Sequence, residues 1–163
     1  MEKKIIEKFG NKLRVRVCGI LIEDQRILLV KHRSIGQKGI LWAPPGGGMQ
    51  FSENAEDNLI REFKEETGLK IHVDRFLFTH EFLQPPLHAV ELFFKVSRSH
   101  GELKKGIDPE MNIDEQIITD VSFLNFDQIK KIEDKSLHYI LRIIRNLNDL
   151  FKIEGYVKFE DFT

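Results

Sequence analysis

Short runs of apolar and β-branched residues, separated by polar turns, predict a chain made mostly of strands. The strands are expected over residues 13–22, 26–31, 40–43, 71–81, 89–96 and 117–124. A turn at residues 23–25 would join the first two strands as a hairpin, and the polar stretch 97–115 would form the longest loop. Apolar residues at helical spacing predict an amphipathic helix from Ser136 to about Leu150. With another helix between the strands, this order favours an α/β fold with a mixed sheet.

The other predicted helix, over residues 55–67, is marked at both ends. Asn54 is a suitable N-cap, because its side-chain oxygen can accept a backbone amide of the first turn, and Gly68 is typical of the residue that follows a helix. At about 100° per residue, the apolar residues fall on one side of this helix and a charged group falls on the other. The charged side carries Arg61, Glu62, Glu65 and Glu66.

The three glutamates on this side destabilise the helix when they stand alone. Glu62 lies three and four residues before Glu65 and Glu66, spacings at which like charges repel by about 0.2–0.5 kcal/mol per pair. Glu65 and Glu66 also lie in the last turn, where the helix dipole disfavours anions. A divalent cation such as Mg²⁺ would reverse both effects, because it prefers carboxylate oxygens. The helix alone leaves open a solvated charged face in which Arg61 bridges Glu65.

Three consecutive glycines, Gly46 to Gly48, precede the helix and favour the metal site over the solvated face. Glycine is useful where the main chain turns with positive φ or comes close to a ligand. A backbone without side chains can offer carbonyls to a metal or amides to a phosphate. The sequence therefore predicts a metal site on the helix, beside a loop suited to metal or phosphate.

These residues resemble the signature of the Nudix hydrolases. That signature asks for Gly, five residues, Glu, seven residues, Arg-Glu, an aliphatic or aromatic residue, any residue, Glu-Glu, any residue, Gly and an apolar residue. The chain meets every demand, with Gly47, Glu53, Arg61, Glu62, Phe63, Glu65, Glu66, Gly68 and Leu69. The segment from Trp42 to Gly46 is also similar to the usual lead-in of the family. Gln50 departs from the many members that have Glu there, which bears on metal or substrate preference.

The resemblance implies a single Nudix domain over residues 1–163, folded as an α/β/α sandwich with a mixed β-sheet. It also implies Mg²⁺ as the cofactor, with Mn²⁺ as the alternative. The number of metal ions stays open. By similarity to the family, the metal ligands would be Glu62, Glu65, Glu66 and the Gly46 carbonyl.

The activity implied is hydrolysis of a pyrophosphate bond in a nucleoside diphosphate linked to a group X. The signature from Gly47 to Leu69 is called the box below. Its catalytic residues would be Glu62 and Arg61, with Arg61 orienting the carboxylates and Glu53 supporting the loop or the metal shell. A general base is also needed, which family members take from the box or from an outlying loop. Outside the box the candidates are, in order, Glu115, Glu110 and Glu81.

The candidate substrate contacts are Gly47, Trp42, His88 and Pro85. Trp42 is suited to stack on a base, and His88 lies at the predicted edge of a loop and a strand. Pro85 lies 16 residues after the box, where family members that cleave ADP-ribose often carry proline. We rank ADP-ribose or a nucleotide sugar first, and a nucleoside triphosphate, including an oxidised one, second. The alternative from another class is a nucleotide sensor without catalysis, although such modules usually lose the acids that this chain keeps.

Composition narrows the partners and the compartment. The 25 Lys and Arg and the 26 Asp and Glu give a net charge of −1, without a general attraction to polymeric nucleic acid or to membranes. We therefore expect a small nucleotide as the partner. The single cysteine, Cys18, lies in an apolar run and indicates a buried inert thiol in a reducing compartment. No signal-peptide core follows Met1, so we expect a cytoplasmic protein, with monomer and homodimer both open.

The histidines give no strong metal motif. A zinc-protease helix would need a second His where Gln84 follows His80-Glu81. For His72, His100 and His138 we expect surface or structural roles rather than metal ligation.

Overall fold

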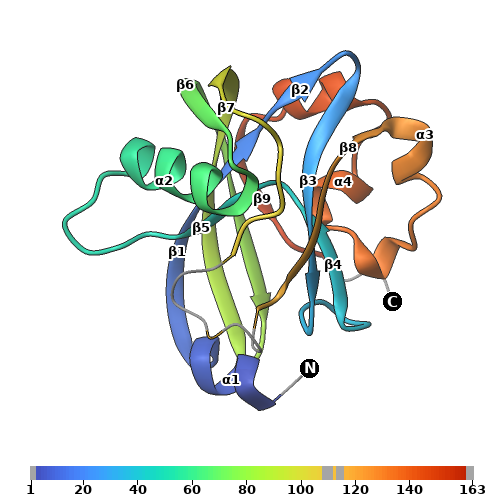
Figure 1. The fold of residues 1–163 in the computed structure, drawn as a ribbon. Helices are drawn as coiled ribbons and strands as arrows, with labels where there is room; N and C mark the ends of the chain where they lie inside the picture. Colours follow the sequence, from blue (N-terminus) through green and yellow to red (C-terminus); the bar gives the residue numbers. More distant parts are fainter. Residues whose placement is uncertain (1–2, 108–111, 113–115, 161–163) are drawn as a thin grey trace.

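The computed structural model describes residues 3–107, 112 and 116–160, and Figure 1 shows the arrangement of their helices and strands. In chain order the elements are α1 (Lys3–Phe9), β1 (Lys12–Ile20), β2 (Ile22–Glu23), β3 (Arg26–Arg33), β4 (Ile40–Ala43), β5 (Gly46–Gly48), α2 (Ala55–Thr67), β6 (Lys70–Gln84), β7 (Leu87–His100), β8 (Ile118–Asn125), α3 (Phe126–Ile129), the 3₁₀ helix η2 (Asp134–Ser136), α4 (Tyr139–Arg142), the 3₁₀ helix η3 (Leu147–Phe151) and β9 (Gly155–Lys158).

Within the described residues the strands form two sheets. The first is five-stranded and mixed, in the order β5-β1-β7-β6-β9, with β1 parallel to β7 and β6 parallel to β9. In the second, which is four-stranded, β3 pairs with β2, β4 and β8, and all three pairings are antiparallel. Figure 1 shows α2 on the side of the first sheet and α3 and α4 on the side of the second.

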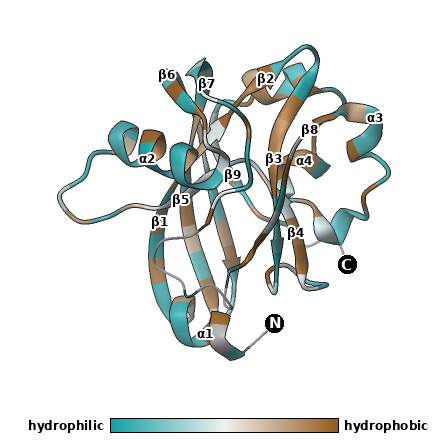
Figure 2. Cartoon of the chain, viewed as in Figure 1, coloured by the Kyte–Doolittle hydropathy of each residue, from teal (hydrophilic) through white to brown (hydrophobic). Residues whose placement is uncertain are grey.

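Alternate residues of β1 and β3 enter two different cores. One core contains Val17 and Leu28 and packs against α2. The other contains Cys18 and Leu29 and packs against apolar residues between positions 129 and 150. Figure 2 shows hydrophobic and hydrophilic residues alternating along β1. Strands between two helical layers confirm the predicted α/β/α sandwich with a mixed sheet.

The acidic helix has its predicted bounds. The Asn54 side chain accepts the Asp57 amide at 2.9 Å, and Gly68 follows the helix with a φ of 72°. Phe63, on the apolar side, is fully buried in the core beneath α2. The opposite side of α2 is therefore free to carry the charged residues.

The hairpin expected between residues 13–22 and 26–31 is wrong in its first strand. β1 ends at Ile20 and pairs with β5 and β7, so that only β2 pairs with β3. The chain passes from one sheet to the other at the buried Leu21, whose carbonyl accepts the Leu28 amide at 3.0 Å. One apolar run thus serves two sheets, which local alternation does not reveal.

The continuous helix expected from residue 136 to 150 is also wrong. The structure has the four-residue α4 and, separately, η3. The Asp149 carboxylate accepts the amides of Arg145 and Asn146 at 2.9 and 3.1 Å. Such side-chain acceptors compete with the helical hydrogen bonds. The apolar spacing still works for packing, because Leu150 remains fully buried.

The elements without a counterpart among the predicted ones include α1 and β9. β6 and β7 are longer than predicted and meet at Pro85–Pro86, so that His88 lies within β7 rather than in a loop. β9 adds an edge strand with only Val157 partly buried, which leaves no apolar alternation to detect. Across residues 3–107 and 116–160, no helix is long and apolar enough to cross a membrane.

Truncation of Leu29 tests the position of the second core. Leu29 is fully buried, so Leu29→Ala removes contacts and leaves a cavity, which should lower the free energy of unfolding by about 2–5 kcal/mol. Leu13→Ala is the matched control, since Leu13 is also on a strand but is 63% exposed, and it should change this free energy by about 0.5 kcal/mol or less. Urea denaturation measures both. Equal losses in the two variants would contradict this core.

Candidate active site

The glycine loop forms β5, which pairs with β1 and lies next to α2. The Gly46 amide donates to the Glu66 carboxylate at 2.9 Å. A side chain at Gly47 would collide with the carboxyl group of Glu62, and one at Gly46 would collide with the Val17 carbonyl. The glycines predicted that the loop lies close to another group, but they did not indicate which group this is. The structure shows that the loop lies against the carboxylates of the acidic helix.

Arg61 binds several acids at once. Its guanidinium donates to Glu53 at 3.0 Å, and a single nitrogen, Nη1, lies 3.1 Å from both Glu62 and Glu65. It also donates to Asn58 at 3.0 Å, and Asn58 accepts the Gln50 amide at 3.0 Å. Asn58 was not among the predicted site residues. It ties the segment after the glycine loop to α2.

The remaining glutamate, Glu66, lies apart from this group. It is turned toward the Gly46 amide, and its Oε1 lies 4.0 Å from Nε2 of His32. Glu62 and Glu65 therefore share a cation, Arg61, whereas Glu66 is held by the glycine loop.

Arg61 does not fully compensate the negative charge of the glutamates in this site. Burial and the neighbouring Glu66 charge raise the pKa of Glu62 to about 7, even though Arg61 acts in the opposite direction. The atoms that these three glutamates offer to a metal are carboxylate oxygens, which suit a hard divalent cation. The residues present therefore fit a metal held by Glu62, Glu65 and Glu66, beside Gly46.

A cavity of about 1110 Å³ opens from this acid cluster. It runs along one side of β1, β7 and β6. These strands contribute lining side chains that lie outside the box. The side chains that matter below are Arg14, Arg16, His80, Glu91 and His138. This volume is slightly above the usual range of small-molecule sites.

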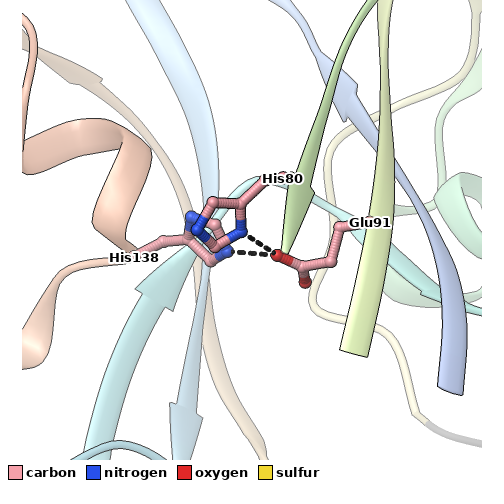
Figure 3. A group of neighbouring side chains, drawn as sticks. All are labelled: His80, Glu91 and His138. Atoms are coloured by element: carbon pink, nitrogen blue, oxygen red, sulfur yellow. Dashed lines mark hydrogen bonds and ion pairs between the residues drawn. The ribbon is translucent and has the colours of Figure 1, made fainter. Parts of the chain in front are cut away.

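Glu91 and two histidines form a buried network in the wall of the cavity, shown in Figure 3. One carboxylate oxygen of Glu91 lies 2.9 Å from Nδ1 of His80 and 2.8 Å from Nε2 of His138. Burial alone would raise the pKa of Glu91, but His138, His80 and Arg16 together hold it well below its usual range. Glu91 is therefore a buried anion at neutral pH.

Two features argue against a metal ion between these three side chains. Nδ1 of His138 accepts the Ile140 amide at 3.4 Å, so its Nε2 carries the proton and donates to Glu91 rather than binding a metal. A guanidinium nitrogen of Arg16 lies 3.7 Å from the other Glu91 oxygen and already supplies positive charge. Sequence reasoning missed this network. Its one signal was Glu91 itself, a lone carboxylate in an apolar stretch of strand.

Three of the four candidate substrate contacts line this cavity and one does not. Gly47, Pro85 and His88 line the cavity. Trp42 is not among the lining residues and packs against the second core instead. Nε2 of His88 donates to the Glu81 carboxylate at 2.8 Å.

Glu81, one of the outlying acids, is not among the residues that line the cavity. Its carboxylate accepts from His88 and Tyr156. Glu115 and Glu110, the other candidates for the general base, lie outside the described residues.

An acidic helix, a glycine loop against its carboxylates and an adjoining cavity define a class of enzyme, the hydrolases of phosphate anhydrides. Comparison with known families makes this specific. The family model described as NUDIX domain matches residues 12–142. The chain therefore belongs to the Nudix family, and it is a pyrophosphohydrolase of that family.

Individual relatives differ in the substrates that their names give. An ADP-ribose pyrophosphatase from Methanocaldococcus jannaschii is 33% identical over 138 residues, which cover 82% of this chain and 80% of the relative. An 8-oxo-dGTP diphosphatase from Buchnera aphidicola is 33% identical over 87 residues, which cover 53% of this chain and 65% of the relative. Among solved structures, a NUDIX hydrolase from Nitrosomonas europaea has a TM-score of 0.67 at 17% identity, covering 80% of this chain and 84% of the other. That likeness shows the fold.

Replacing Glu62 with a neutral residue tests whether the carboxylates of α2 repel one another in the metal-free protein. The pKa of Glu62 is raised from 4.5 to about 7, so the metal-free protein loses stability as the pH rises through this window. With EDTA present, Glu62→Gln should raise the free energy of unfolding at pH 8 by about 1–3 kcal/mol, and by less at pH 5. Urea denaturation at both pH values measures this effect.

The control is Glu56→Gln on the exposed side of the same helix, which should behave alike at both pH values. A Glu62→Gln variant no more stable than wild type at pH 8 would show that the carboxylates do not repel in the folded protein.

Proposed function

We propose that the protein hydrolyses the pyrophosphate bond of a nucleoside diphosphate linked to a group X, with ADP-ribose or a nucleotide sugar as the first candidate. The observation that carries the proposal is the acid cluster at the end of a cavity, with the carboxylates bound by Arg61 and by the glycine loop. The Methanocaldococcus jannaschii relative, matched over most of both chains, supports ADP-ribose. Pro85, at the cavity wall, adds to this support.

The proposed cofactor is Mg²⁺, with Mn²⁺ as the alternative. Glu62, Glu65 and Glu66 would hold it, with the Gly46 carbonyl as a further ligand. When bound, such an ion supplies charge neutralisation at phosphoryl oxygens and lowers the pKa of coordinated water.

The protein's own residues then have separable tasks. Arg61 keeps Glu62 and Glu65 in fixed orientations by hydrogen bonds of 3.1 Å to each. Glu53 holds Arg61 from the other side at 3.0 Å, which couples the loop before α2 to the acids. The pKa of Glu62 is raised to about 7 without a metal, and a cation held by its carboxylate would lower it again. Glu115 stays a prediction as an outlying base.

A second candidate substrate is a nucleoside triphosphate, including an oxidised one. The Buchnera aphidicola relative favours it, over a smaller part of the chain. A sensor without catalysis has less support, because all the acids of the box are retained and are hydrogen-bonded.

A nucleotide panel tests the proposed function. ADP-ribose, a nucleotide sugar, a nucleoside triphosphate and 8-oxo-dGTP are assayed with Mg²⁺, and the products are separated by chromatography. We expect ADP-ribose or the nucleotide sugar to give the highest kcat/KM. In Glu66→Gln the kcat should fall by at least about 100-fold, because a proposed metal ligand is lost.

Glu56→Gln is the matched control, since it removes an exposed carboxylate of the same helix and should keep wild-type kcat. Turnover that survives Glu66→Gln unchanged would refute the role of the box, and fastest cleavage of a triphosphate would replace the first substrate with the second.

A further inference from the structure

The first half of β1 carries its charged residues on the inner side and its apolar residues on the outer side. Leu13 and Val15 are 63% and 43% exposed. Arg14 and Arg16, which alternate with them, line the cavity. Turning a guanidinium away from bulk water is costly unless it gains a partner. We therefore expect the two guanidinium groups to bind an acceptor group inside the cavity.

Among the described residues, Arg14 lacks an acidic or hydrogen-bonding partner. Within residues 3–107, 112 and 116–160 it makes no hydrogen bond and no ion pair, and its guanidinium carbon lies 4.1 Å from the centroid of the Phe9 ring. Burial and the nearby Arg16 charge lower the pKa of Arg14 to about 10, so the group stays charged at neutral pH. Its five N–H donors are thus available to a ligand.

Arg16 is only partly compensated. Its nearest acid among the described residues is Glu91, at 3.7 Å, and its Nε is buried without a hydrogen-bond partner. Arg16 pairs with Gly48 on one neighbouring strand and with Glu91 on the other, and Glu91 pairs with His80. The register therefore places Arg16 between the glycine loop and the buried network of Figure 3.

Arg14 also lies against the glycine loop. A side-chain carbon at Gly48 would come within 3.7 Å of Nη2 of Arg14. The proposed metal ligands are at the other side of this loop, where Gly47 faces Glu62. Cations on β1 and acids on α2 thus border the same end of the cavity.

We propose that Arg14, together with Arg16, binds a phosphate group of the substrate, and that the Phe9 ring holds the Arg14 guanidinium in position. The planar fork of a guanidinium matches two phosphate oxygens, and such charged hydrogen bonds are about twice as strong as neutral ones. This inference rests on the proposed function, because it assumes a diphosphate substrate. The arginines of β1 would bind the part of the diphosphate that the box does not hold. It makes Arg14 a residue that selects substrates with two linked phosphates over those with one.

Binding of inorganic pyrophosphate tests this proposal directly. Isothermal titration calorimetry with Mg²⁺ compares wild type with Arg14→Met, which keeps most of the side-chain stem and removes the donors. The dissociation constant should rise roughly 10- to 100-fold. Arg14→Lys should recover part of the affinity, because it restores the charge without the fork. Phe9→Ala should weaken binding by roughly 2- to 5-fold.

The matched control is Arg26→Met, at an exposed arginine of β3, which should bind pyrophosphate as wild type does. A structural role would show in the melting temperature, which we expect Arg14→Met to leave unchanged or to raise. With the best nucleotide of the panel, Arg14→Met should raise KM more than it lowers kcat. Unchanged pyrophosphate affinity in Arg14→Met, or no binding by wild type, would overturn the proposal.

The two hypotheses fail separately. If Glu66→Gln abolishes turnover while Arg14→Met binds pyrophosphate like wild type, the enzyme function stands and the phosphate site falls. If turnover survives Glu66→Gln while Arg14→Met loses affinity, the anion site stands and the proposed function falls.

Discussion

Carboxylate crowding on one side of α2 is the constraint from which the other features of the site follow. Burial and the neighbouring Glu66 charge raise the pKa of Glu62 to about 7, against the opposing effect of Arg61. Arg61 relieves only part of this deficit, since one guanidinium serves Glu53, Glu62 and Glu65 together. The glycine loop can approach the same carboxylates only because Gly47 has no side chain. The carboxylates are thus brought together at the expense of local stability.

The sheet supplies the opposite charge at the same end of the cavity. His80 and His138 keep Glu91 ionised, and Glu91 in turn is the nearest carboxylate to Arg16. The histidines therefore act on the cavity indirectly, through the electrostatics of a buried carboxylate. Two regions of opposite sign, one on a helix and one on a strand, suit a ligand that combines a cation with a polyanion. Such a ligand is what a metal–diphosphate complex offers.

Features determined by neighbours in sequence could be predicted, and features determined by strand pairing could not. The bounds of α2 follow from Asn54 and Gly68, and the grouping of its acids follows from helical spacing. The meeting of His80, Glu91 and His138 depends on a hairpin and on a segment 47 residues further along, which no local pattern encodes. The failed helix after Ser136 has a local cause, the Asp149 carboxylate, which accepts the backbone amides of Arg145 and Asn146.

The parallel pairing of β1 with β7 has a consequence for folding fidelity. A slip of one residue would exchange the sides of a strand completely, and would replace both arginines of the cavity with Leu13 and Val15. Gly19 makes such a slip costly, because any side chain at its position would collide with the Phe63 ring of α2. A misaligned chain would therefore bring a side chain against the Phe63 ring of α2. The docking of α2 and the inward position of Arg14 and Arg16 thus depend on the same strand register.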